Sequence, residues 1–292
     1  MSTLKRTAWL NRGYGEFEVN NTQLKIESDF DNIVLFDLDG TLTEARQVMS
    51  NSMIPVLKDL AEVAEIGIVT GSDYRYLVEQ VDYLMNTSQV RYKLHLLPCN
   101  GTKYYKPPTT AECKHELFSE SNMKDRIGSQ VFKDLMSFLI GRQARIRYSG
   151  IPLTGQFFDY RGSMINWCPI GRNANREERN YFVDYDLSYE VRLQEMKAIE
   201  NFLSERNYSE LVTIKLGGDT SFDIYPKGWD KTYCLRHFEN KNYFFVGDRC
   251  SPSGNDYELY NHLNTLGRSF ETKGPFNTEC IIREKIIPII KE

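Results

Sequence analysis

The segment Ile33–Thr43 reads IVLFDLDGTLT, four apolar residues followed by two aspartates that bracket one leucine. Side chains alternate between the two faces of a strand, so Asp37 and Asp39 are expected on the same side. Two carboxylates where a buried parallel strand ends can bind a hard divalent cation, while one attacks phosphorus and the other moves a proton. A lone D-x-D more often marks a strand followed by a turn, but the longer string D-L-D-G-T-L-T is much more specific.

Composition narrows the class of protein. The 292 residues are 41% hydrophobic and 26% charged, as in an ordinary soluble globular protein, and the formal charge of −4 gives no reason to expect nucleic acid or a membrane as the main partner. The six cysteines form no C-x-x-C pair, and the beginning of the chain lacks an apolar signal region. We therefore expect a cytoplasmic protein with reduced thiols.

Strand and helix patterns alternate on both sides of a long central segment, which predicts a parallel sheet with helices on both faces. We expect one core domain from 31–113 and 228–292, with its strands at 32–38, 66–70, 93–101 and 242–248. The intervening helices are expected at 51–64, 74–85, 229–238 and 255–263, and a last helix from about 278.

The central segment has a different sequence pattern: short strand-like runs are separated by turn residues, which is typical of an antiparallel sheet. We expect an inserted α+β cap domain at 114–227, with hinges near Pro107-Pro108 and Lys227-Gly228. Its elements are a helix at 125–140, strands at 155–162, 163–169, 211–218 and 221–226, and one or two helices within 175–206. Residues 1–30 are expected to be an N-terminal extension without chemistry of its own.

A second acidic cluster follows the strand at 242–248, where Gly247-Asp248 precedes Gly254-Asn255-Asp256. Open α/β sheets bind ligands beyond the carboxyl ends of their strands, so Asp37, Asp248 and Asp256 are candidate Mg²⁺ ligands at one edge. Lys231 is the candidate to offset these crowded carboxylates. Thr70 and Ser72, at another strand-to-helix turn, could donate hydrogen bonds to a phosphate.

These pieces follow the order D-x-D-G-T, small hydroxyl residue, Lys, G-D-x5-G-N-D, which resembles the haloacid dehalogenase (HAD) phosphotransferase superfamily with a C2-type cap. Three segments, 161–179, 217–237 and 247–260, resemble the eukaryotic-type phosphomannomutases more closely. The resemblance extends over roughly 30–270 and implies an α/β fold: a HAD-like Rossmannoid core with a parallel sheet, plus an inserted α+β cap with an antiparallel sheet.

The resemblance also implies residue roles. Asp37 would be the phosphoryl acceptor and Asp39 the general acid/base, with Asp37, the Asp39 main-chain carbonyl and Asp248 binding Mg²⁺. The residues that would bind the hexose phosphate are Arg46, Arg161, Arg172, Arg179, Ser221 and Asp223. The family further implies a homodimer formed through the cap and a hexose 1,6-bisphosphate activator.

Three functions are compatible with these residues. The leading hypothesis is a mutase that interconverts mannose 6-phosphate and mannose 1-phosphate, in which the cap arginines hold the phosphate that is not being transferred. The alternative is a sugar-phosphate phosphatase of the same subclass, in which water attacks the phospho-aspartate. A sensor without catalysis would have lost a catalytic group, yet Asp37, Asp39, Lys231 and Asp248 are all present.

Overall fold

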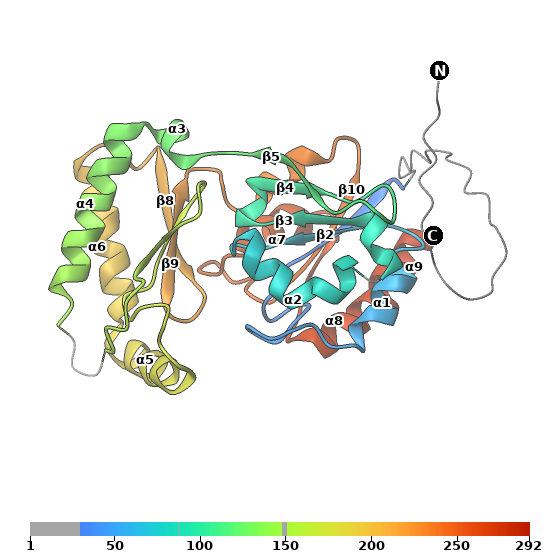
Figure 1. The fold of residues 1–292 in the computed structure, drawn as a ribbon, viewed down its shortest axis with the longest axis horizontal. Helices are drawn as coiled ribbons and strands as arrows, with labels where there is room; N and C mark the ends of the chain where they lie inside the picture. Colours follow the sequence, from blue (N-terminus) through green and yellow to red (C-terminus); the bar gives the residue numbers. More distant parts are fainter. Residues whose placement is uncertain (1–29, 87, 148–150) are drawn as a thin grey trace, which may run out of the picture.

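The computed structural model describes residues 30–86, 88–147 and 151–292. They form two bodies connected by two crossings of the chain, a core at one end and a cap at the other (Figure 1). The extension expected at 1–30 lies outside the described residues, apart from Phe30. Among the described residues, no helix combines the length and the apolar character needed to cross a membrane.

The core is built on a seven-stranded sheet in the order β11-β10-β1-β2-β3-β4-β5. Neighbouring strands from β11 to β3 run parallel, as predicted, whereas β4 and β5 are antiparallel additions. The core strands are β1 (Asn32–Phe36), β2 (Glu65–Val69), β3 (Leu94–Leu97), β4 (Lys103–Lys106), β5 (Glu116–Glu120), β10 (Asn242–Gly247) and β11 (Ser269–Glu271).

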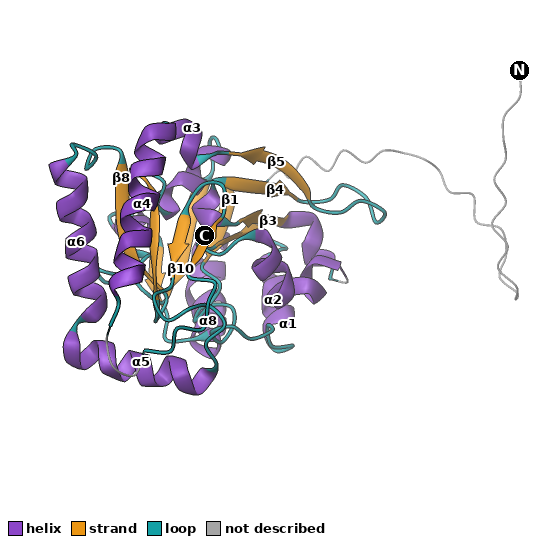
Figure 2. Cartoon of the chain, turned by 60° about the vertical axis from the view of Figure 1, so that its left-hand side comes forward, coloured by secondary structure: helices purple, strands orange, loops and turns teal. Residues whose placement is uncertain are grey.

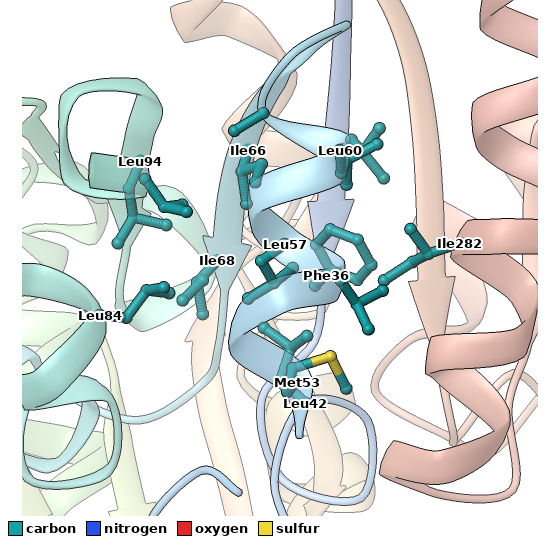
Figure 3. Close-up of a cluster of buried hydrophobic side chains, with 14 of the residues drawn as sticks. Phe36, Leu42, Met53, Leu57, Leu60, Ile66, Ile68, Leu84, Leu94 and Ile282 are labelled. Carbon is teal, nitrogen blue, oxygen red and sulfur yellow. The ribbon is translucent and has the colours of Figure 1, made fainter. Parts of the chain in front are cut away.

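Helices cover both faces of this sheet, because successive residues of its buried strands point in opposite directions. Phe36 faces a cluster with α1, α2 and the C-terminal helices, whose packing Figure 3 shows around Leu57, while Leu35 faces a second cluster with α7. The core helices are α1 (Met53–Leu60), α2 (Tyr74–Asn86), α7 (Tyr257–Asn264), α8 (Pro275–Ile281), the π-helical turn η4 (Ile282–Ile286) and α9 (Ile287–Lys291), with 3₁₀ turns η1 (Gln89–Lys93), η2 (Cys99–Gly101) and η3 (Lys231–His237).

The cap is a four-stranded antiparallel sheet in the order β6-β7-β9-β8. Figure 2 shows α4 and α6 on the same side of this sheet, where Trp167 and Phe222 are fully buried beneath them. The cap elements are α3 (Met123–Ile127), α4 (Ser129–Arg145), β6 (Phe158–Tyr160), β7 (Ile165–Trp167), α5 (Arg176–Tyr189), α6 (Val191–Glu205), β8 (Val212–Gly217) and β9 (Ser221–Pro226).

Several local expectations need correction. The helix expected at 125–140 is divided at Gly128, whose φ of 86° leaves the helical region. The segment after Asp230 forms the 3₁₀ turn η3 rather than an α-helix. At the expected hinge Pro107-Pro108, the strand β4 ends, because a proline has no N–H to donate, and β5 returns to the core sheet before the chain enters the cap near Ser121. We therefore propose that the cap begins after β5.

Candidate functional site

Three neighbouring strands deliver the predicted polar residues to one edge of the core sheet. Asp37 follows β1, Asp248 follows β10 and Thr70 follows β2, and these strands are adjacent in the parallel part of the sheet. The Asp37 amide donates to the Val246 carbonyl at 3.0 Å, which holds the aspartate at the end of the strand. The topology alone therefore brings two carboxylates and a hydroxyl together from distant parts of the sequence.

Lys231 lies beneath this edge and is fully buried. Its ammonium donates to Asp37 Oδ1 and, at 2.6 Å, to Asp256 Oδ1. Burial lowers the pKa of Lys231, but the negative charges of Asp256 and Asp37 outweigh it and raise that pKa. The lysine is therefore a permanent cation, which provides the charge compensation that crowded carboxylates require.

The acidic cluster fits a divalent cation. Asp37, Asp248 and Asp256 each offer one oxygen, and these oxygens all lie within 4.8 Å of one another. Asp248 Oδ1 is buried without a hydrogen-bond partner, which is costly unless something else binds it. Both Asp256 oxygens are already engaged, by Lys231 and by the Arg249 amide at 2.9 Å. Asp37 and Asp248 are therefore the more available ligands.

Burial also shifts the pKa values of two of these carboxyls, those of Asp37 and Asp248. It raises the pKa of Asp37, an effect that Lys231 opposes and that Asp256 and Asp248 reinforce. It raises the pKa of Asp248 to about 6, with a further contribution from the charge of Asp256. In the absence of a cation, ionised forms are therefore disfavoured at this edge, and a bound cation would reverse that preference.

A cavity of about 630 Å³ lies over this edge, between core and cap. That volume is in the range of small-molecule sites. Ten of the thirteen predicted site residues line it: Asp37, Asp39, Arg46, Thr70, Ser72, Arg161, Arg172, Arg179, Ser221 and Asp223. The other three, Lys231, Asp248 and Asp256, are not among the lining residues and contact each other or Asp37 at its base.

The cap contributes a positive wall. Arg179 belongs to α5, which starts with a capping box between Asn175 and Glu178. Its guanidinium donates to Thr220 Oγ1 at 2.8 Å and to the Arg172 carbonyl at 2.8 Å. Burial and the charge of Arg46 lower the pKa of Arg179, while burial and then the charge of Arg161 lower the pKa of Arg172. Such mutual repulsion among cations favours an anion in the cavity.

Asn166, which the sequence analysis missed, connects the predicted sugar-binding residues. Its Nδ2 donates to Asp223 Oδ1 at 2.8 Å and to Ser221 Oγ at 3.1 Å, and its Oδ1 accepts from Arg172 at 2.7 Å. The one sequence signal was an amide side chain within the buried strand Ile165–Trp167, where a polar group needs partners.

The loop after β2 carries both a predicted phosphate contact and a contact with the cap. Thr70 Oγ1 accepts from the Ser72 amide at 3.1 Å, and Gly71 lies between them. The Gly71 carbonyl accepts from Arg161 Nη1 of the cap at 2.7 Å. Arg161 is only 6% exposed, so this charged hydrogen bond is shielded from water.

Two ion pairs also join core and cap. Arg249, which lines the cavity, pairs with Asp219 at 2.7 Å, and Lys215 of β8 pairs with Glu258 of α7 at 2.7 Å. The sequence gives no direct signal for either pair, because the partners meet only when the two domains face each other. The structure thus holds the cap against the core over the cavity.

Sequence comparisons point to one family. A model of the eukaryotic phosphomannomutase family matches residues 53–287. A phosphomannomutase of Encephalitozoon cuniculi is 37% identical over 246 residues, covering 82% of this chain and 89% of the relative. One from Dendrobium officinale is 34% identical over 250 residues, covering 85% of this chain and 92% of the relative.

Solved structures are similar in fold at low identity. An IMP-bound, N-terminally truncated IMP-nucleotidase of Plasmodium falciparum has a TM-score of 0.59 at 12% identity, covering 88% of this chain and 68% of that one. The C-terminal domain of a Candida albicans trehalose-6-phosphate phosphatase has a TM-score of 0.51 at 16% identity, covering 80% and 74%. Both are similar to this chain in fold.

Proposed function

This chain belongs to the eukaryotic phosphomannomutase family, and from that premise we propose how its residues interconvert mannose 6-phosphate and mannose 1-phosphate. The observation that carries the proposal is the two-sided cavity. The carboxylates Asp37 and Asp39 line it from the core, and Arg172 and Arg179 line it from the cap. A mutase needs both sides, because one phosphate reacts while the other must be held.

We propose that phospho-Asp37 starts the cycle. Its phosphoryl group passes to the free hydroxyl of the sugar monophosphate, so the bond from Asp37 to phosphorus breaks as the sugar oxygen bonds to phosphorus, and Asp39 takes the hydroxyl proton. The bisphosphate then reorients in the cavity, so that its second phosphate faces Asp37. That phosphoryl group is transferred to Asp37, and Asp39 gives its proton to the departing sugar oxygen. Because Lys231 engages Oδ1 of Asp37, Oδ2 is the attacking atom.

The remaining assignments follow the contacts described above. Thr70 and Ser72 would bind the transferring phosphoryl group, and Ser221 and Asp223, organised by Asn166, would bind sugar hydroxyls. Arg46, Arg161, Arg172 and Arg179 provide the positive charge for the idle phosphate. When bound, Mg²⁺ would neutralise charge on the transferring phosphoryl oxygens, held by Asp37, Asp248 and the main-chain carbonyl of Asp39.

We also propose the biological setting that the family implies: a cytoplasmic enzyme that supplies mannose 1-phosphate for GDP-mannose biosynthesis and uses a hexose 1,6-bisphosphate as activator. A homodimer through the cap is supported by apolar side chains that stand exposed on α5 and α6. Leu187 is 78% exposed, and Tyr181, Tyr189 and Leu193 accompany it. Leu187→Glu should therefore shift the protein toward monomer in light scattering.

A coupled assay tests the reaction. With Mg²⁺ and a catalytic amount of hexose 1,6-bisphosphate, the protein is expected to convert mannose 1-phosphate to mannose 6-phosphate with little release of phosphate. Isomer and free phosphate should be measured in the same samples, beside glucose 1-phosphate. Steady phosphate release without isomerisation would contradict the mutase proposal and favour the phosphatase alternative.

Cation binding is expected to depend on pH. The pKa of Asp248 is raised from its ordinary value of 3.8 to about 6, and the pKa of Asp37 is also raised. Without cation, these groups contribute stability below pH 4 that is lost as pH rises through the folded pKa values. Mg²⁺ needs the ionised carboxylates, so its apparent affinity should rise by up to about tenfold per pH unit for each proton released.

Thermal unfolding at pH 5 and pH 8, with Mg²⁺ or with a chelator, measures this dependence. The increase in melting temperature caused by Mg²⁺ should be larger at pH 8, and Asp248→Asn should greatly reduce it. An increase of the same size at both pH values would show that the cation binds elsewhere.

A further inference from the structure

The Asp39 carboxylate is held by three hydrogen bonds to a single oxygen. Its Oδ1 accepts from the Arg46 amide at 2.7 Å, from the Tyr76 hydroxyl at 3.3 Å and from Gln80 Nε2 at 3.4 Å. Because all three donors converge on Oδ1, the other oxygen, Oδ2, is left for a proton transfer in the cavity.

Two of these donors come from one face of α2. Tyr76 and Gln80 are four residues apart, so their side chains lie one above the other on the helix. The Gln80 amide is itself oriented, because Thr43 Oγ1 donates to its Oε1 at 2.7 Å and thereby leaves its Nε2 for Asp39. The first two turns of α2 therefore act as a support for the Asp39 side chain.

Tyr76 differs from the other two donors in its position. Its side chain lines the cavity, where it is the one aromatic residue among the described lining residues. It follows the loop Thr70–Ser72, so one short segment carries the predicted phosphate contacts and the support of Asp39. A hydroxyl at this position can orient Asp39 relative to a bound sugar.

We propose that Tyr76 is a positioning residue that orients Asp39 for proton transfer to and from the sugar oxygen. The inference rests on the proposed function. In the second half-reaction, the bond from phosphorus to the sugar oxygen breaks as Asp37 bonds to phosphorus, and the proton moves from Asp39 to that oxygen. A misdirected carboxyl slows this step because a sugar alkoxide is a poor leaving group.

The dependence on the leaving group separates this role from a general structural one. An aryl phosphate such as 4-nitrophenyl phosphate loses an aryl oxide that departs without a proton. When the phosphoryl group passes from the aryl phosphate to Asp37, the bond between the aryl oxygen and phosphorus breaks. This step needs Asp37, Lys231 and Mg²⁺, but not Asp39. The burst of 4-nitrophenol in the first turnover reports this step alone.

Tyr76→Phe tests the proposal, because it removes the hydroxyl and keeps the ring. We expect kcat for mannose 1-phosphate to fall roughly tenfold, part of the ~10²–10⁴-fold that a positioned acid/base provides, with KM unchanged. The first-turnover burst with 4-nitrophenyl phosphate should keep its wild-type rate. The matched control is Tyr74→Phe, two residues earlier, whose ring stacks on Tyr105 at a centroid distance of 4.0 Å. It should match wild type in both assays.

Equal losses with both substrates would overturn the proposal and assign Tyr76 a general structural role. Unchanged kinetics with both would show that the other two donors suffice to orient Asp39, which also overturns it. The proposed function fails differently: wild-type protein would then release phosphate without isomerising the sugar. In that case, the loss of rate that Tyr76→Phe causes with the sugar phosphate, compared with its loss with the aryl phosphate, still tests the role of Tyr76.

Discussion

Replacing Asp37 with asparagine is expected to abolish turnover while sugar-phosphate binding survives. The amide cannot attack phosphorus, and loss of a nucleophile costs at least about 10⁴-fold in kcat. The cap groups Arg172 and Arg179 stay in place because their hydrogen bonds are to Asn166, Thr220 and the main chain of the cap. Turnover should be followed in the coupled assay, and binding of mannose 1-phosphate by titration calorimetry.

Asp59→Asn is the matched control for this substitution. Asp59 lies on the outer surface of α1, half exposed, in an ion pair with Arg283 at 2.9 Å. An exposed pair of this kind contributes about 0–1 kcal/mol, so both activity and binding should match wild type. If Asp37→Asn retains a substantial fraction of wild-type activity, Asp37 is not the nucleophile.

Replacing Lys231 with methionine should affect both stability and activity. Methionine has a similar volume but leaves Asp37 and Asp256 buried without their cation. Removing one partner of a buried ion pair typically costs about 3–5 kcal/mol. Loss of a group that stabilises charge on the phosphoryl group should lower kcat by about 10²–10³-fold. The stability cost should be smaller at pH 5, because the raised pKa of Asp37 lets that carboxyl take up a proton instead.

Lys227→Met is the matched control, because it removes the same charge from a lysine that is exposed rather than buried. Lys227 is four residues away and pairs with Glu210 at 2.6 Å, but its side chain is 50% exposed. Its loss should change the free energy of unfolding by less than about 1 kcal/mol. Urea unfolding of both variants gives the comparison. Equal, small effects would mean that neither Asp37 nor Asp256 needs the charge of Lys231 in the native protein.

Much of the core could be predicted because its strands are short apolar runs that alternate with amphipathic helices. The parallel order then places residues that follow separate strands, such as Asp37 and Asp248, at one edge. The strand β5 could not be predicted, because it is an edge strand of largely exposed residues that includes Glu116 and Glu120 and has no apolar face. Its pairing with β4 depends on tertiary contacts that no local pattern records.

The site residues, too, divide into those that could be predicted from the sequence and those that could not. Residues with distinctive chemistry in a motif, such as Asp39 and Lys231, could be recognised from the sequence. Tyr76 could not, because a tyrosine in an amphipathic helix is normally a packing residue. Asp219 and Arg249 are similar cases, since their pairing depends on how the cap faces the core. Supporting residues are defined by three-dimensional neighbours rather than by spacing in the sequence.

The buried contact between Arg161 and the Gly71 carbonyl bears on the fate of the bisphosphate. A newly formed bisphosphate has two competing exits: it can turn within the closed cavity, or it can diffuse away once the cap opens. When the cap opens, the buried guanidinium of Arg161 must separate from the Gly71 carbonyl, which slows the escape of the bisphosphate. Rotation of the sugar within the closed cavity does not require this separation. We expect this contact to favour retention, so that one activator molecule supports many catalytic cycles before it is lost.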